Sequence, residues 1–137
     1  MKLVVDTNIL VSFFRENPVR AIILGSDLFC IELHTPEHGF KELLNIKGEL
    51  SKYSKISSSE VEFIFDELKK HVKIIPDESS KLYEEQAKIL SPHDKDISFF
   101  ALALKLDCAI WSNEPAFKEQ SKIEILNTSD LRELLKV

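Results

Sequence analysis

The sequence has only three glycines and two cysteines in 137 residues, and no apolar run approaches the roughly 20 residues needed to cross a bilayer. So few glycines leave no glycine-rich loop to cradle phosphate, which excludes nucleotide binding of the Rossmann or Walker type. The opening residues also lack the long apolar region and cleavage site of a secretion signal. We therefore expect a soluble, cytoplasmic protein without a membrane segment.

The two cysteines, Cys30 and Cys108, both lie in apolar stretches, and neither has a cysteine or histidine nearby at the spacing of zinc ligands. The four histidines are scattered along the chain rather than paired. Zinc is therefore disfavoured. We expect both cysteines to be buried, reduced thiols rather than a disulfide or a metal pair.

Positive charge is also scarce. The chain has 18 basic and 23 acidic residues, which gives a formal net charge of −5. This balance argues against a nucleic-acid binder that works through a bulk positive field. It leaves open an acidic enzyme whose bound divalent cations reverse the local charge of its carboxylates and so admit phosphates.

Short apolar runs alternate with helical patterns along the chain. The candidate strands cover residues 3–5, 28–33, 72–75, 108–111 and 123–126. Helices are expected after Ser57, where Glu60 can complete a capping box, and from Thr128, and the polar segment 47–59 is expected to be a mobile connection. The alternation predicts one α/β domain over residues 1–137, a three-layer sandwich with a central parallel sheet of four to five strands.

The first candidate strand ends in the segment VVDTNIL, which places Asp6 directly after the apolar run. In parallel α/β sheets, ligands gather outside the carboxyl ends of the strands, near the point where the strand order reverses. Asp6 would stand at that edge, and Thr7 and Asn8 could fix the orientation of its carboxylate. A helix cap for a helix starting near Ile9 is the other interpretation, and the residue alone does not decide between them.

Two more acids adjoin apolar helix faces. Glu42 lies in the helix predicted by LHTPEHGFKELLN, with Thr35 as its cap, and an ordinary solvated glutamate is the alternative. Asp96 adjoins an apolar run in HDKDISFFALAL, where desolvating a carboxylate is costly unless a cation meets it. The alternative interpretation of Asp96 is a first-turn acid stabilised by the helix dipole. Asp94 is expected to complete a capping box with Ser91 as the N-cap.

The last acid of interest is Glu114 in the segment IWSNEPAF. Small polar residues and an acid again follow a candidate strand, as they do at Asp6. The alternative is a helix start, with Asn113 as the cap and Pro115 in the first turn.

Together these acids predict a carboxylate cluster at one edge of a single sheet. Several neighbouring carboxylates cannot all stay ionised without a compensating cation. Ligands that offer only oxygen suit Mg²⁺ or Mn²⁺. Such a cluster suits phosphodiester hydrolysis, in which a bound ion activates water and steadies the leaving oxygen.

Four segments, VVDTNIL, KELL, DISFFALAL and IWSNEPAF, occur in an order and at intervals that resemble the PIN-domain family of small metal-dependent ribonucleases, which includes VapC toxins. The resemblance covers nearly the whole chain. It implies that four acids bind the metal and carry catalysis: Asp6, Glu42, Asp96 and Glu114.

The same resemblance implies that Asn8 and Ser112 orient these acids. One departure stands out, because the family's last motif usually carries an aspartate where this chain has Glu114. The longer side chain puts full occupancy by two ions in question. Asp94, two residues before Asp96, is the residue that could compensate.

The function implied is a Mg²⁺- or Mn²⁺-dependent endoribonuclease that leaves 5′-phosphate and 3′-hydroxyl ends, because water rather than the ribose 2′-hydroxyl would attack. By resemblance, it would form a homodimer and serve as the toxin of a toxin–antitoxin pair with a small antitoxin partner. The alternative is a PIN-like module that has lost catalysis and acts in RNA binding or as a scaffold. A HAD-type phosphatase is disfavoured, since Asn8 stands where that class needs a second aspartate.

Overall fold

The computed structural model describes residues 1–137. Its elements follow in chain order: β1 (Lys2–Val5), α1 (Thr7–Ser12), α2 (Pro18–Leu24), β2 (Glu32–Pro36), α3 (Glu37–Asn45), α4 (Lys47–Ser54), α5 (Ser58–His71), β3 (Val72–Ile75), the 3₁₀ helix η1 (Asp77–Tyr83), α6 (Glu84–Leu90), the 3₁₀ helix η2 (Asp94–Asp96), α7 (Ile97–Leu106), β4 (Ala109–Trp111), the 3₁₀ helix η3 (Pro115–Glu119), β5 (Ile125–Leu126) and α8 (Thr128–Leu135).

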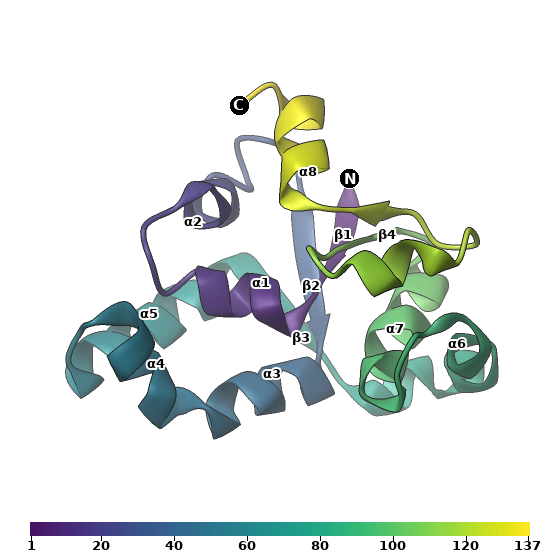
Figure 1. Ribbon diagram of the computed structural model, residues 1–137, viewed down its shortest axis with the longest axis horizontal. Coiled ribbons are helices and arrows are strands. Elements are labelled where there is room, and N and C mark those ends of the chain that lie inside the picture. The colour runs from purple at the N-terminus through teal and green to yellow at the C-terminus, as the bar shows by residue number, and fades with distance from the viewer.

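The five strands form one sheet in the order β3-β2-β1-β4-β5, and every neighbouring pair is parallel. In Figure 1 the strands stand in the middle of the molecule, with α1 and α2 on one side and α6 and α7 on the other. The predicted α/β sandwich with a parallel sheet of up to five strands is confirmed.

Successive side chains of β1 enter different halves of the core, as the period of a strand requires. Leu3 and Val5 join the cluster built with α1, α2 and α5, whereas Val4 joins the cluster built with α7. Both faces of the sheet are therefore covered, and the ends of the strands are left to form functional sites.

Helix α7 is apolar nearly all round, because five consecutive residues, from Phe99 to Ala103, are buried. It packs against β1 and β2 on one side and against α6 and η1 on the other. A helix enclosed in this way is held firmly. It fixes the position of Asp96, the residue that immediately precedes it.

Some local expectations were wrong. The first half of the apolar run 28–33 is turn, with Leu28 at 89% exposure, and β2 starts only at Glu32. Most of the polar segment 47–59 is helical, in α4 and the start of α5. Cys30 is exposed and Cys108 only half-buried, although both are free as expected. Hydrophobic content alone could not place these segments, because burial depends on what packs against them.

Two expected caps are also absent, although the capping box of Ser57 with Glu60 is confirmed. The Thr35 hydroxyl donates to the Val5 carbonyl at 3.0 Å across the sheet instead of capping α3. The Ser91 hydroxyl donates to the carbonyl of His93, and α7 begins later, at Ile97. Both hydroxyls therefore donate to a backbone carbonyl, and neither caps the helix that the sequence suggested.

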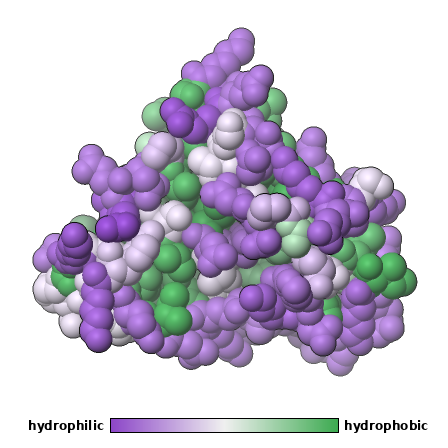
Figure 2. All heavy atoms as spheres, viewed as in Figure 1, coloured by the Kyte–Doolittle hydropathy of each residue, from purple (hydrophilic) through white to green (hydrophobic).

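The surface is mainly hydrophilic on the face shown in Figure 2, with hydrophobic residues visible in separate patches. The most exposed large apolar side chains, Leu28, Leu82 and Ile89, belong to a turn, to η1 and to α6. None of the helices has both the length and the apolar character that spanning a membrane would require.

His34 of β2 is 5% exposed, and neither of its ring nitrogens has a hydrogen-bond partner. Burial, and next the charge of Lys73, lower the pKa of this histidine. A buried polar group without a partner costs about 1–3 kcal/mol. We expect His34→Leu, which is close in volume, to raise the free energy of unfolding by about 1 kcal/mol at pH 7, measured by urea denaturation.

The same substitution should also change the acid response. Because the folded pKa of His34 lies below its unfolded value, the unfolded state takes up a proton first as the pH falls below about 6.5. Below this pH the wild type should therefore lose stability relative to His34→Leu. Equal slopes of stability against pH in the two proteins would show that His34 does not contribute.

Candidate functional site

The site lies where the strand order reverses. The chain builds outward from β1 to β2 and β3, then returns to place β4 on the opposite side of β1. The connections that follow β1 and β4 therefore run in opposite directions. This leaves a crevice at the carboxyl ends of these two strands, as in other parallel α/β sheets. Asp6 follows β1, and Ser112 follows β4.

A pocket of about 160 Å³ occupies this edge of the sheet. The structure brings all four predicted acids to it. The pocket is lined by nine residues: Asp6, Thr7, Asn8, Glu42, His93, Lys95, Asp96, Glu114 and Phe117. We call it the acid pocket. Asp6 and Asp96 are each only 6% exposed, so two of its carboxylates are held largely out of water.

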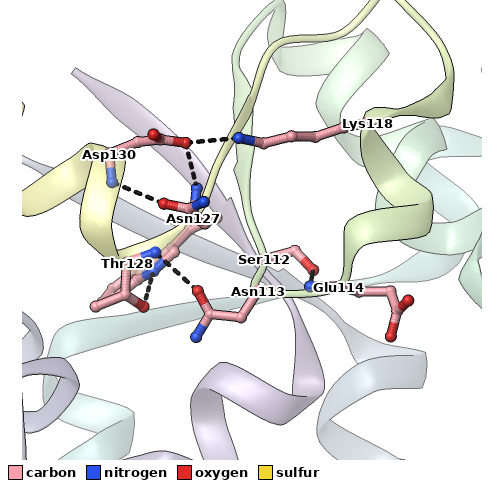
Figure 3. A network of polar contacts seen from close by, with 8 residues as sticks. Ser112, Asn113, Glu114, Lys118, Asn127, Thr128 and Asp130 are labelled. Carbon is pink, nitrogen blue, oxygen red and sulfur yellow. Dashed lines mark hydrogen bonds and ion pairs between the residues drawn. The ribbon is translucent and has the colours of Figure 1, made fainter.

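Asp6 is anchored from the neighbouring strand. The Ser112 hydroxyl donates to Asp6 Oδ2 at 2.9 Å. Figure 3 shows that Ser112 Oγ itself accepts from the Glu114 amide, at 3.1 Å. Burial raises the pKa of Asp6 to about 6, an effect that the Ser112 hydrogen bond opposes and the nearby Asp96 reinforces. The predicted orienting role of Ser112 has a direct geometric basis in this contact.

Glu42 reaches the pocket from α3. Its Oε1 accepts from the Thr7 hydroxyl at 3.1 Å and lies 3.7 Å from His38 Nε2. Thr7 therefore orients Glu42, whereas the sequence suggested that it would orient Asp6. The partner could not be read from the sequence, since 35 residues separate Thr7 from Glu42.

Asp96 lies at the junction of η2 and α7. Burial raises its pKa, and the charges of Lys95 and His93 partly offset this effect. These two residues also line the acid pocket, and the sequence analysis had not singled them out. Their positions within three residues of Asp96 were the only available signal. Lys95 places a positive charge beside the acids.

Glu114 is exposed, and its Oε1 accepts from the Ala116 amide at 3.4 Å at the start of η3. It thus forms the cap that the alternative interpretation had assigned to Asn113. Asn113 instead accepts from the Thr128 amide at 2.7 Å and ties this loop to α8 (Figure 3). Glu114 lines the acid pocket but is the least enclosed of its acids.

The two remaining candidates contribute less to the acid pocket. Asn8 lines it, but its side chain is exposed and makes no hydrogen bond to an acid. Asp94 lines a neighbouring cavity instead. Compensation by Asp94 for the longer Glu114 has no support in this arrangement.

A sequence model described as a PIN domain matches residues 4–133. The chain belongs to the PIN-domain family. Proteins of this family are generally nucleases that use divalent metals. No curated protein matches the chain.

Among solved structures, the chain is similar to VapBC2 from Rickettsia felis, which was crystallised with a DNA fragment from its promoter. The TM-score is 0.67 at 16% sequence identity, and the match covers 93% of this chain and 98% of the other. At this identity the likeness concerns the fold, which is shared over almost its full length.

The acid pocket of this PIN domain fits a hard divalent cation by its chemistry. Its acids offer oxygen donors, and neither Asp6 nor Asp96 forms an ion pair within the protein. Buried carboxylates without a counterion are the expected ligands of such an ion. The side chains are not gathered as a ready ligand set, because no three His, Cys, Asp or Glu residues are placed to hold an ion together.

Ser112→Ala tests the anchoring of Asp6. Removing the hydroxyl leaves one oxygen of a buried carboxylate without its donor and frees the Glu114 amide. Loss of such a supporting hydrogen bond typically lowers metal affinity or activity by about 10- to 100-fold. We expect a loss of this size in nuclease assays at saturating Mn²⁺ or in Mn²⁺ affinity measured by calorimetry. Ser112→Thr, which keeps the hydroxyl, should retain more of both.

Proposed function

We propose that the protein is a Mg²⁺- or Mn²⁺-dependent endoribonuclease that hydrolyses RNA phosphodiester bonds. One observation carries the proposal: Asp6, Glu42 and Asp96, which come from three distant parts of the chain, line one pocket at the switch point of a PIN domain. A family of nucleases and a pocket rich in oxygen donors support the same chemistry.

Asp6, Glu42 and Asp96 are the residues that would hold the ion, with Glu114 beside them. A bound Mg²⁺ or Mn²⁺ supplies the positive charge that makes water a better nucleophile and steadies charge on the phosphate. Ser112 and Thr7 keep one oxygen of Asp6 and one of Glu42 directed by hydrogen bonds.

The pocket also holds hydrogen-bond donors of its own. Lys95 and His93 provide donors for the phosphate oxygens of the strand, and Lys95 forms no ion pair that would compete. The overall charge of −5 leaves no broad positive surface to hold nucleic acid. Binding should therefore depend strongly on these local contacts.

The products of cleavage test the proposed reaction. With Mn²⁺ present, single-stranded RNA should yield fragments with 5′-phosphate and 3′-hydroxyl ends, and EDTA should stop the reaction. Mass spectrometry of the fragments distinguishes the ends. A 2′,3′-cyclic phosphate would show that the ribose hydroxyl attacks and would contradict the proposed use of water. Single-stranded DNA of the same sequence should be cut more slowly if RNA is the substrate.

The biological setting that we propose is that of a toxin restrained by a small antitoxin protein. The support is the fold shared with the VapBC2 structure, which contains both kinds of chain. We also propose that the protein forms a homodimer, which sedimentation can test. Growth arrest on expression, relieved by a protein encoded next to it, would support the toxin assignment.

The rival function is a PIN module without catalysis that binds RNA or a partner protein. The exposed position and capping role of Glu114 favour it, because this acid is the least available to a second ion. Calorimetric titration of Mn²⁺ distinguishes the two. Equal heats for wild type and Asp6→Asn, with no cleavage by either, would favour the rival.

A further inference from the structure

A second cavity adjoins the acid pocket at the same edge of the sheet. Its volume is about 260 Å³, and its walls come from the starts of α3 and α6, from η1, from η2 and from the first turns of α7. Lys95 lines both cavities. His38 lines the second, while its Nε2 lies 3.7 Å from Glu42 Oε1 of the first. The two cavities therefore lie next to each other.

The walls of this second cavity are tied together. The His38 amide donates to Asp77 Oδ1 at 3.2 Å, which joins α3 to η1. Gly39 brings α3 so close to α7 that a β-carbon there would lie 2.7 Å from the Phe99 ring. The cavity is therefore a product of packing between elements, which gives it a defined shape.

Several polar groups in this cavity form no hydrogen bond or no ion pair, although His38 Nε2 lies 3.7 Å from Glu42 Oε1. His38 Nε2 and Ser98 Oγ are buried atoms without a hydrogen bond. Lys81 and Lys95 form no ion pair. Buried polar atoms are normally hydrogen-bonded, and unpaired ones need an explanation such as an absent ligand.

The chemistry of the walls narrows the class of ligand. Asp77, Glu84 and Asp94 would repel a free phosphate, so the two lysines alone do not make an anion site. Ile97 and Ala101 provide a small apolar surface beside these donors and acceptors. A nucleotide combines the matching features: a charged phosphate, sugar hydroxyls, and a flat base whose edge both donates and accepts hydrogen bonds.

We infer that this second cavity holds one nucleotide of the RNA strand, next to the bond cut in the acid pocket, with Lys95 on the phosphate between them. The inference rests on the proposed nuclease function. The cavity volume of about 260 Å³ lies just below the range of about 300–1,000 Å³ typical of small-molecule sites, which suits a single nucleotide. The cavity would then set the base preference beside the cut.

Binding can be tested without catalysis. The full-length protein in EDTA is titrated with AMP, CMP, GMP, UMP and inorganic phosphate while backbone amide shifts are followed by NMR. At least one nucleotide should shift the amides of His38, Ser98 and Ala101. Lys81→Ala should weaken that binding about tenfold and Ser98→Ala about fivefold, as expected for a charged and a neutral hydrogen bond.

The matched control is Lys122→Ala, which removes an exposed lysine from a different cavity and should leave binding unchanged. Lys81 is likewise exposed, so its loss should not unfold the protein. Equal binding by wild type and Lys81→Ala would overturn the inference. So would identical shifts from inorganic phosphate alone.

A second measurement separates this inference from the nuclease proposal. With Mn²⁺ and RNA of randomised sequence, Lys81→Ala should relax the base preference beside the cut and raise KM about tenfold with little change in kcat. Cleavage with an unchanged base preference, together with no nucleotide binding, would contradict the subsite in the second cavity but not the nuclease proposal. Nucleotide binding at these residues without any RNA cleavage would contradict the nuclease proposal but not the presence of a nucleotide site.

Discussion

Asp6→Asn is expected to abolish metal-dependent RNA cleavage and, at the same time, to stabilise the metal-free protein at neutral pH. The activity loss should exceed the roughly 10- to 100-fold that follows loss of a supporting hydrogen bond, since Asp6 itself is the proposed ligand. The amide keeps the shape of the side chain and can still accept from the Ser112 hydroxyl at its present 2.9 Å. Only the charge is removed.

The gain in stability follows from the raised pKa of Asp6. Burial shifts this pKa from 3.8 to about 6, so between these values the folded state keeps a proton that the unfolded state has released. The free energy of unfolding therefore falls as pH rises through this window and stays low above it. The difference amounts to about 3 kcal/mol, which Asp6→Asn should largely recover at pH 7.5.

Denaturation curves between pH 4 and pH 8 in EDTA measure this effect. Relative to Asp6→Asn, the wild type should lose stability as the pH rises from 4 to about 6, and the difference between the two proteins should then stay constant up to pH 8. Adding Mn²⁺ at 100 times its Kd should stabilise the wild type by about 2.7 kcal/mol and leave the variant unchanged. The control Asp66→Asn alters an exposed acid on α5 and should behave as wild type in every assay. Cleavage by Asp6→Asn at the wild-type rate would refute the proposed role.

Gly39→Ala should destabilise the protein by about 1–3 kcal/mol, whereas Gly48→Ala should stabilise it by about 0.5–1 kcal/mol. Both glycines lie inside helices, so alanine favours the helix in each case. At Gly39 the new methyl would lie 2.7 Å from the buried Phe99 ring and 3.2 Å from Thr35 Oγ1. At Gly48 it would meet nothing within 4 Å.

Gly39→Ala should also reduce nuclease activity, because α3 carries Glu42 and must shift to relieve the clash. The Gly39 carbonyl accepts from Thr7, the same hydroxyl that holds Glu42, so both contacts would be disturbed. Urea denaturation and a cleavage assay measure the two effects. If both glycine variants changed stability in the same direction, close packing of α3 on α7 would not be the reason for Gly39.

The sequence analysis succeeded where the physical cause is local. β3 was predicted with its observed bounds because its apolar run is short and bounded by polar residues. Asp6 was placed at the strand edge because the carboxyl end of a parallel strand is where ligands gather. The capping box at Ser57 depends only on residues three apart, so it too could be predicted.

The failures involve partners that are distant along the chain. Thr35 was expected at a helix cap but bonds to Val5, 30 residues earlier. Cys30 lies in an apolar run but is exposed, in a left-handed turn with φ of 57°, because nothing packs over it. Lys95 was not singled out, since a lysine next to an acid is common on any surface and only the two cavities distinguish this one.

By itself, the sequence determined the class of fold, the alternation of strands and helices, and the kinds of side chain available for chemistry. These depend on periodicity and residue type, which are properties of neighbouring residues. Only the tertiary structure decided which polar groups meet: Ser112 with Asp6, Thr7 with Glu42, and Lys95 with both cavities. Such pairings depend on how the strands are ordered and how closely α3 approaches α7, and no local pattern encodes those distances.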